Sequence, residues 1–266
     1  MGSMPTLRFR EDRPTLIGVI HLPPLPGSIR YGGLDISTII DFAVRNARVL
    51  DEAGFDGVIL ENFNDYPFKA RVRDPETIAS MAVIAREVVK TVTIPVGINL
   101  LRNSGPEAAA VAIVVGASFI RSNAYCEAVV SAEGILEPVA REVMETMTRL
   151  NSKITVLADV FVKHGSPLHR MTIEDVAKDC VERDLADALV VTGPRTGEPP
   201  DPLLVRRVVK AVSAKVLVGS GITPNNVNDY KDAHGFIVGT YLKDEEGQID
   251  SVKARQLVGA VKQLGK

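Results

Sequence analysis

Residues 215–243 read KVLVGSGITPNNVNDYKDAHGFIVGTYLK and hold two apolar strands, each of which ends in a glycine turn. The first turn is Gly219-Ser220-Gly221, after which Thr223-Pro224 is predicted to open a helix, and the second is Gly239-Thr240. Glycine lets a backbone approach a ligand closely, and a helix N-terminus adds unpaired amide donors and a partial positive charge. Two such turns late in a chain match the phosphate site after strands seven and eight of a (β/α)8 barrel. A pair of ordinary tight loops is the alternative.

The rest of the chain repeats this alternation of strand and helix, which favours βαβ units and a parallel sheet. The candidate strands are Thr15–Ile20, Gly57–Glu61, Val96–Leu100, Phe119–Ser122, Ile154–Asp159, Ala188–Thr192, Val216–Gly219 and Phe236–Val238. Helical periodicity is clearest over Ile36–Leu50, Leu136–Leu150 and Ala254–Leu264. Asp74-Pro75 and Asp201-Pro202 each place a capping side chain before a proline at the first helical position.

Eight strand–helix pairs predict an α/β fold, a (β/α)8 TIM barrel, as a single domain over residues 1–266. An open doubly wound sheet is the alternative, but it requires a glycine-rich turn after the first strand. This chain has His21-Leu22-Pro23-Pro24 there, and proline supplies no amide donor. Residues 1–13 are predicted to be an N-terminal extension, and Met1-Gly2-Ser3 ahead of Met4 is typical of a cloning remnant.

Composition and charge exclude several classes of partner. The net charge is −2 with both signs interspersed, so neither a nucleic-acid backbone nor an anionic membrane is expected to bind. No apolar run is long enough for membrane insertion, and the N-terminus lacks a secretory apolar segment. Cys126 and Cys180 follow no recognisable pattern, so we expect no disulfide and a reducing, cytoplasmic location.

In a barrel of this type, chemistry gathers at the carboxyl ends of the strands. The candidate catalytic residues there are His21, Glu61, Asp159 and Lys163. A histidine is a natural acid or base near neutral pH. Carboxylates at a barrel mouth are expected to be partly desolvated, with raised pKa, unless they form ion pairs with a neighbouring arginine or lysine. Lys163 could form a Schiff base if it is dry enough.

Further polar residues at the strand ends are candidates for binding. The substrate-binding set is Asn62, Asn99, Arg102, Arg121, Asn123, His164 and Thr192. The phosphate-binding set is Gly193, Thr196, Gly219, Ser220, Gly221, Gly239 and Thr240. No short-range ligand spacing predicts a metal, although one ligand each from His21, Glu61 and Asp159 leaves a divalent-metal site open.

Long motifs on the predicted strand-to-helix loops resemble the BtpA/SgcQ family. The matching segments are IGVIHLPPLPGS (17–28), DGVILENFNDYPF (56–68), PVGINLLRN (95–103), GASFIRSN (116–123), ADVFVKHGSPL (158–168), ADALVVTGPRTG (186–197) and VLVGSGITPNNV (216–227). The resemblance runs from Pro14 to about the last helix. It implies a barrel similar to ribulose-phosphate-binding barrels. It also implies two known associations of the family, with photosystem I accumulation in cyanobacteria and with sugar-phosphate genes.

Some members of that family are labelled as similar to phosphoribosylanthranilate isomerase, whose first strand carries a cysteine base where this chain has His21. From the two glycine turns and from the carboxylate, histidine, arginine and lysine side chains at the strand ends, we expect an enzyme acting on a small phosphorylated metabolite, as an isomerase, epimerase or aldol-type lyase. An FMN-binding barrel is one alternative, since the same late turns could hold the FMN phosphate. A non-catalytic assembly factor is the other. A homo-oligomer fits any of the three.

Overall fold

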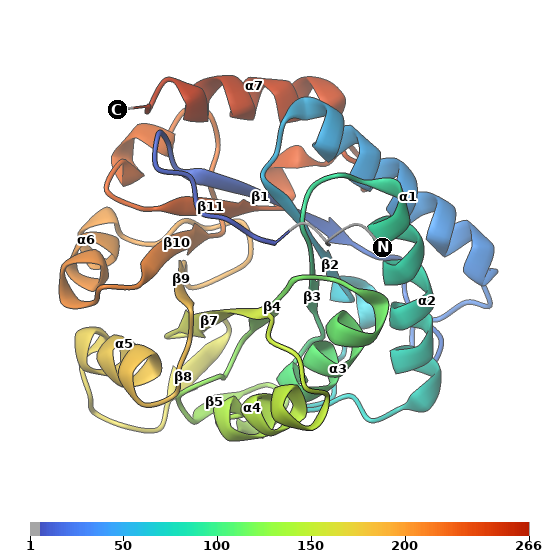
Figure 1. Ribbon diagram of the computed structural model, residues 1–266, viewed down its shortest axis with the longest axis horizontal. Helices are drawn as coiled ribbons and strands as arrows, with labels where there is room; N and C mark the ends of the chain where they lie inside the picture. The colour runs from blue at the N-terminus through green and yellow to red at the C-terminus, as the bar shows by residue number, and fades with distance from the viewer. Residues whose placement is uncertain (1–5, 266) are drawn as a thin grey trace.

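The computed structural model describes residues 6–265, and their parallel strands close into one barrel in the order β1-β11-β10-β9-β7-β4-β3-β2 (Figure 1). The barrel strands are β1 (Thr15–His21), β2 (Gly57–Glu61), β3 (Val96–Asn99), β4 (Phe119–Ser122), β7 (Thr155–Val160), β9 (Ala188–Thr192), β10 (Lys215–Gly219) and β11 (Gly235–Val238). The predicted strands coincide with these apart from single residues at their ends. The TIM-barrel prediction is confirmed, whereas the suggested cloning remnant lies outside the described residues.

Helices surround the barrel, as Figure 1 shows. Those of the described residues are α1 (Ile36–Ala53), α2 (Pro75–Thr91), α3 (Gly105–Val115), α4 (Ala140–Arg149), α5 (Ile173–Glu182), α6 (Pro202–Ala211) and α7 (Ser251–Lys262). Helix α1 shows how the local sequence sets the ends of a helix. The Asp35 carboxylate accepts a hydrogen bond from the amide of Ser37 at the start, and Gly54 ends the helix in the left-handed region. None of the helices in this described part has the length and apolar character needed to cross a membrane.

Two helix predictions are wrong in detail. Helix α4 begins only at Ala140, because Leu136 belongs to a short strand. Thr223-Pro224 opens no α-helix either. The Asn226 side chain accepts from the Thr223 amide at 2.9 Å and donates to the Gly221 carbonyl at 2.8 Å, which closes a turn instead. Only a 3-10 segment, η2 (Val227–Tyr230), follows. The glycine turn after β10 therefore lacks the helix dipole that the sequence predicted.

Alternate residues of each strand point into the barrel. The interior cluster contains Leu7, Ile17, Val19, Ile59, Phe119, Leu157, Ala188, Val190, Leu217 and Ile237. Leu7 belongs to the predicted extension and packs near Gly57, at the start of β2. Because every second residue of a strand faces inward, the positions two residues after this cluster form a further inward layer at the carboxyl ends of the strands. That layer consists of His21, Glu61, Asn99, Arg121, Asp159, Thr192, Gly219 and Gly239. Six polar residues and two glycines thus close the top of the barrel.

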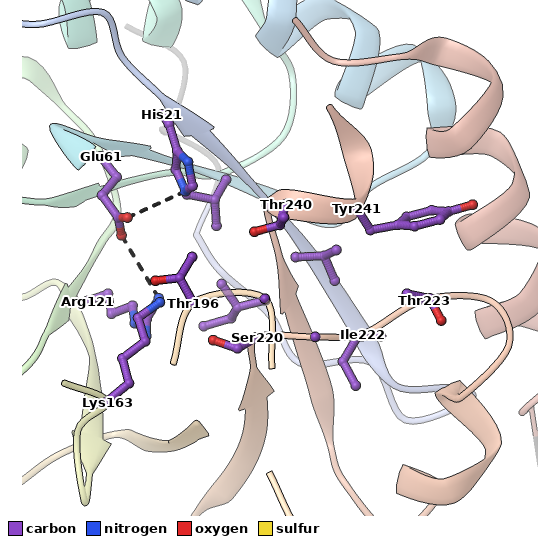
Figure 2. A pocket seen from close by; sticks show the side chains of 16 residues that line it. His21, Glu61, Arg121, Lys163, Thr196, Ser220, Ile222, Thr223, Thr240 and Tyr241 are labelled. Carbon is purple, nitrogen blue, oxygen red and sulfur yellow. Dashed lines mark ion pairs between the residues drawn. The ribbon is translucent and has the colours of Figure 1, made fainter. Parts of the chain in front are cut away.

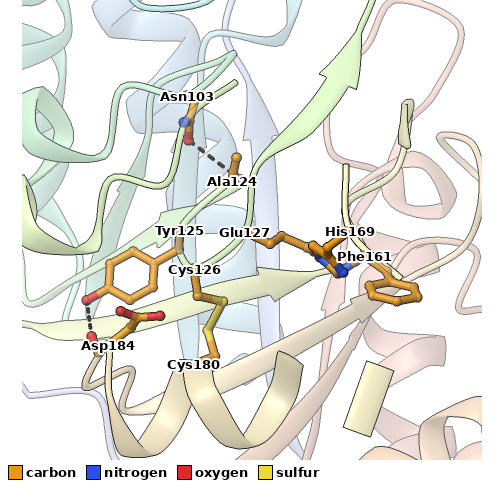
Figure 3. The surroundings of a disulfide bond; sticks show 9 residues. All are labelled: Asn103, Ala124, Tyr125, Cys126, Glu127, Phe161, His169, Cys180 and Asp184. Atoms are coloured by element: carbon orange, nitrogen blue, oxygen red, sulfur yellow. Dashed lines mark hydrogen bonds and ion pairs between the residues drawn. A yellow bond between two sulfur atoms is a disulfide. The ribbon is translucent and has the colours of Figure 1, made fainter. Parts of the chain in front are cut away.

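The loops after β4 and β7 form a small antiparallel sheet of their own, which the sequence did not predict. Its strands are β5 (Val129–Ser131), β6 (Gly134–Leu136) and β8 (Gly165–Pro167), with β5 in the middle. A disulfide joins Cys126, just before this sheet, to Cys180 of α5 (Figure 3). The prediction of no disulfide is wrong. The apolar stripe of α5 does bury Cys180, as expected, and that face meets the loop carrying Cys126.

Candidate functional site

A cavity of about 160 Å³ lies at the carboxyl ends of the barrel strands (Figure 2). Four acidic or basic side chains line it, from β1, β2, β4 and the loop after β7: His21, Glu61, Arg121 and Lys163. The remaining wall comes from Val19 and from residues 196–197, 220–223 and 237–241, which include Ser220-Gly221 and Gly239-Thr240 of the two glycine turns. The structure therefore brings three of the four candidate catalytic residues into one space with the candidate phosphate-binding turns.

Glu61 is buried and faces His21. Its Oε1 lies 3.6 Å from Nε2 of His21, and its Oε2 accepts from Nδ2 of Asn99 at 2.6 Å. Burial opposes ionisation of Glu61, but the positive charges of Arg121 and Lys163 and the Asn99 amide hold its pKa below the ordinary value. The prediction of a raised pKa for this carboxylate is wrong. Glu61 is an anion at neutral pH.

His21 is a neutral imidazole in this environment. Burial lowers its pKa to about 3, although the nearby Glu61 acts in the opposite direction. The ring stacks on Phe63 of the 3-10 segment η1 (Phe63–Asp65), with centroids 4.2 Å apart. A neutral imidazole held in one place can donate or accept a hydrogen bond, but it does not carry a charge. The expectation of an ordinary acid or base near pH 7 is therefore not met by His21.

Asp159 does not line the cavity. Its carboxylate is fully buried and takes two bonds from Arg121, Nε to Oδ1 at 2.8 Å and Nη2 to Oδ2 at 2.9 Å. Nδ2 of Asn123 donates to the same Oδ2 at 2.9 Å. Asp159 belongs to the inward layer at the barrel mouth but is not open to the cavity, and the alternative of an ion pair with Arg121 is the one that the structure shows. Asp159 orients Arg121, whose Nη1 lies 4.0 Å from Oε2 of Glu61.

Lys163 reaches the cavity from a backbone that two predicted substrate-binding residues hold in place. Thr192 Oγ1 accepts from the Lys163 amide at 3.2 Å, and Nη2 of Arg102 donates to the Lys163 carbonyl. Burial, reinforced by Arg121, lowers the pKa of Lys163 to about 8. Arg102 and Thr192 therefore contact the protein rather than the cavity. Their contribution is the position of Lys163.

The remaining predicted binding residues divide into buried and exposed ones. Asn62 is buried behind the site, where its side chain accepts from the Leu101 amide at 2.7 Å. His164 is exposed, and its Nε2 lies 3.1 Å from Oγ1 of Thr196. That contact ties the loop after β7 to the loop after β9. Of these residues only Thr196 lines the cavity.

Steric contacts explain the glycines of the phosphate-binding set. A Cβ on Gly221, whose φ is +67°, would lie 2.2 Å from the Pro199 nitrogen, and one on Gly193 would lie 2.0 Å from the Glu198 carbonyl oxygen. A Cβ on Gly239 would lie 3.2 Å from Nε2 of His21. The glycines thus let the loop after β9 and the two turns approach one another and leave the space above them open.

Sequence analysis missed Lys243. It follows the 3-10 segment η3 (Thr240–Leu242) and shows the same change as Lys163, since burial lowers its pKa to about 7 while Glu61 acts in the opposite direction. Nothing in the sequence near the Gly239-Thr240 turn distinguishes Lys243 from a surface lysine. No cluster of three His, Cys, Asp or Glu side chains able to hold a metal ion occurs in residues 6–265. His21, Glu61 and Asp159 are therefore not assembled as a ligand set.

Comparison with known sequences finds one family along almost the whole chain. The model of the BtpA family matches residues 12–263. An uncharacterised protein of Pyrococcus furiosus is 47% identical over 89% of this chain and 88% of its own length. Photosystem I biogenesis protein BtpA of Synechocystis is 38% identical over 88% of this chain and 82% of its own length.

Comparison with solved structures finds barrels at low sequence identity. One is (S)-3-O-geranylgeranylglyceryl phosphate synthase from Thermoplasma acidophilum in complex with sn-glycerol-1-phosphate, with a TM-score of 0.59, 15% identity, and coverage of 95% of this chain and 94% of that chain. Another is phosphoribosyl anthranilate isomerase from Thermus thermophilus, with a TM-score of 0.58, 12% identity, and coverage of 94% and 100%. At these identities the likeness establishes the fold alone.

Proposed function

The chain belongs to the BtpA family, and from that membership and the cavity at its barrel mouth we propose that it is an enzyme acting on a small phosphorylated metabolite. The reaction is a proton transfer next to a carbonyl group, as in an isomerase, an epimerase or an aldol-type lyase. The observation that carries the proposal is the meeting of two glycine turns with four ionisable side chains in one cavity. The turns would hold the phosphate, and the four side chains would move the proton and stabilise the negative charge that develops on the substrate.

The phosphate end of the ligand is assigned to the turns 219–221 and 239–240, with Thr196 and Gly197 on the facing loop. Glycine turns at the ends of the last two strands are the usual phosphate site of this fold. Two of the structurally similar barrels are named for phosphorylated compounds, which supports the assignment. The cavity of about 160 Å³ is smaller than the ~300–1,000 Å³ typical of drug-sized ligands, which favours a small metabolite over a flavin ring.

The chemical end is assigned to the four ionisable side chains. Lys163 has a pKa of about 8, the nearest to neutrality among them, so its neutral form can take the proton from carbon and its ammonium form can return it. Arg121 and the neutral His21 face the same cavity and can stabilise the negative charge that develops on the substrate oxygen. Asp159 acts by positioning Arg121.

A thermal-shift screen tests the phosphate half of the proposal. Inorganic phosphate and a panel of sugar phosphates should raise the melting temperature, because a ligand that binds only the folded state stabilises it. The unphosphorylated sugars serve as matched controls and should give no shift. With a substrate in hand, Lys163→Met should reduce kcat by about 10²–10⁴ while KM changes little.

A second candidate, a non-catalytic assembly factor, is favoured by one observation. Val130 and Ile135 lie directly opposite each other on β5 and β6 and are 43% and 61% exposed, with Leu168 close by at 55%. Exposed apolar side chains on one face of a sheet can bind a partner protein. Absence of a shift with every phosphorylated compound of the panel would favour this role over the enzyme.

A further inference from the structure

A second hollow, of about 450 Å³, adjoins the cavity on the side of α1. The two share three lining residues: His21, Thr196 and Thr240. The remaining walls of this outer hollow are Pro23, Phe42, Phe63, Asn64, Lys243, Glu246 and Gly247. A ligand whose phosphate lies at the glycine turns can therefore extend past His21 into the outer hollow.

The outer hollow has an apolar, aromatic side. Phe42 of α1 and Phe63 of η1 are both half-buried. Phe63 is held by its stack on His21, with an angle of 20° between the ring planes. Rings fixed in this way offer flat apolar surfaces at little cost in conformational entropy. They suit a planar or apolar part of a ligand.

The outer hollow also contains a basic side chain, that of Lys243. The backbone of Lys243 is fixed on both sides, because its amide donates to the Thr240 carbonyl at 3.3 Å and its carbonyl accepts from Nζ of Lys253 at 2.6 Å. Its own Nζ has no hydrogen-bond or ion-pair partner within residues 6–265, and Glu246, on the wall of the same hollow, does not pair with it. A half-buried ammonium group without a partner costs free energy, which an anionic group of a ligand would offset.

We propose that the outer hollow binds the second half of the metabolite, a planar or apolar moiety bearing a carboxylate or another anionic group that pairs with Lys243. The inference rests on the proposed function for the phosphate end. It narrows the substrate class from phosphorylated metabolites in general to compounds with two separated anionic groups. Glycerol phosphate and similar compounds, whose phosphate is their one anionic group, would fill only the inner cavity.

Calorimetric titration with a matched pair of probes tests this inference. The probes are phenyl phosphate and 4-carboxyphenyl phosphate, with inorganic phosphate as the reference, in a buffer below neutral pH where Lys243 is charged. One charge-assisted hydrogen bond predicts that the carboxylate raises affinity about tenfold. Lys243→Met should abolish that gain and leave the affinity for phenyl phosphate within about twofold. Lys210→Met, on the exposed side of α6, is the matched control and should change neither value.

The possible failures are distinguishable. If none of the three compounds binds the wild-type protein, the proposed function itself fails and the inference falls with it. If phenyl phosphate binds but the carboxylate adds nothing, or its gain survives in Lys243→Met, the outer hollow does not take an anionic moiety. If Lys243→Met weakens phenyl phosphate as much as 4-carboxyphenyl phosphate, Lys243 belongs to the phosphate site instead.

Discussion

Glu61 and Asp159 both follow apolar residues at the end of a barrel strand, yet their carboxylates make different contacts. Asp159 is fully buried and uses both oxygens on Arg121 and Asn123, so no oxygen is left for a ligand on the cavity side. Glu61 is held through one oxygen by Asn99 and turns the other towards His21. The difference arises from the neighbouring strand, because β4 supplies an arginine beside Asp159 and β3 supplies a neutral amide beside Glu61.

Replacing Asp159 should lower the free energy of unfolding as well as the turnover number. Asp159→Asn removes the carboxylate that pairs with the buried Arg121 at 2.8 Å, and breaking a buried ion pair costs about 3–5 kcal/mol. Denaturant unfolding should therefore show a lower midpoint. Asp12→Asn, in an exposed pair with Arg10, is the control and should leave the midpoint almost unchanged. An unaltered midpoint in Asp159→Asn, together with lost turnover, would instead identify Asp159 as the catalytic base.

Lys243 should make the stability of the ligand-free protein depend on pH. Its pKa falls from 10.5 to about 7 on folding, so between these values the unfolded chain binds more protons than the folded one. Burial of Lys243 therefore lowers the unfolding free energy by its full amount below pH 7, and this penalty becomes smaller as the pH rises towards 10.5.

Lys243→Met removes this penalty. The variant should melt several degrees above the wild type at and below pH 7, and the gap should narrow as the pH rises towards 10.5. Melting curves of both proteins across this range measure the effect, with the exposed Lys210→Met as control. A gap that does not change with pH would mean that burial does not shift the pKa of Lys243.

Among the elements, the turn after β10 is held by packing rather than by a helix. Asn226 closes the turn through its side chain, and the loop after β9 lies against Gly221. Ser220 adopts φ +108°, in the left-handed region that disfavours a side chain. Strained residues of this kind persist where the surrounding structure fixes them, and they gather at functional sites.

Gly221→Ala should disturb this turn. The new Cβ meets the Pro199 nitrogen, and alanine is strained at a φ of +67°, so the loop after β9 must move. We expect phosphate affinity to fall at least about tenfold, since one charge-assisted contact is worth that much. Gly33→Ala has a similar φ of +79° but open space around it, so it reports the backbone strain alone. Equal phosphate affinity in the two variants would remove the turn from the binding site.

The elements that sequence predicts best are those with long apolar runs between glycine or proline signals, such as β10 and β11. The three-residue strands β5, β6 and β8 carry too short a pattern, and they form only because two loops distant in sequence meet. The Thr223-Pro224 signal leads only to a turn, because the Asn226 side chain bonds to both the Thr223 amide and the Gly221 carbonyl and closes the chain there. Lys243 was missed because nothing local shows that the chain after η3 passes beside His21.

For the molecule as a whole, the disulfide connects the loop after β4 to α5 across 54 residues. This bond removes the basis on which a reducing compartment was expected. Closing a loop of this size should add roughly 2–4 kcal/mol to the unfolding free energy. The wild-type protein should therefore unfold at lower denaturant concentration under reducing conditions.

Paired substitution of Cys126 and Cys180 by serine is the control for the disulfide. The double variant should match the reduced wild type and should not respond to a reductant. Thiol labelling of the unreduced, denatured wild type should find no free cysteine. Two labelled thiols would show that the purified protein lacks the bond.

Gly219 ends β10 and Gly239 directly follows the neighbouring strand β11, and the cavity is lined by the turns at these two positions, so the open space at the barrel mouth is off-centre. A ligand anchored there can extend towards His21 of β1 and Glu61 of β2, which line the same cavity (Figure 2). Its two molecular faces then meet different surroundings, and Lys163 can reach only one of them. If a proton is transferred to a planar intermediate, such an arrangement implies that one stereoisomer of the product is formed, and the positions of the two glycines determine which one.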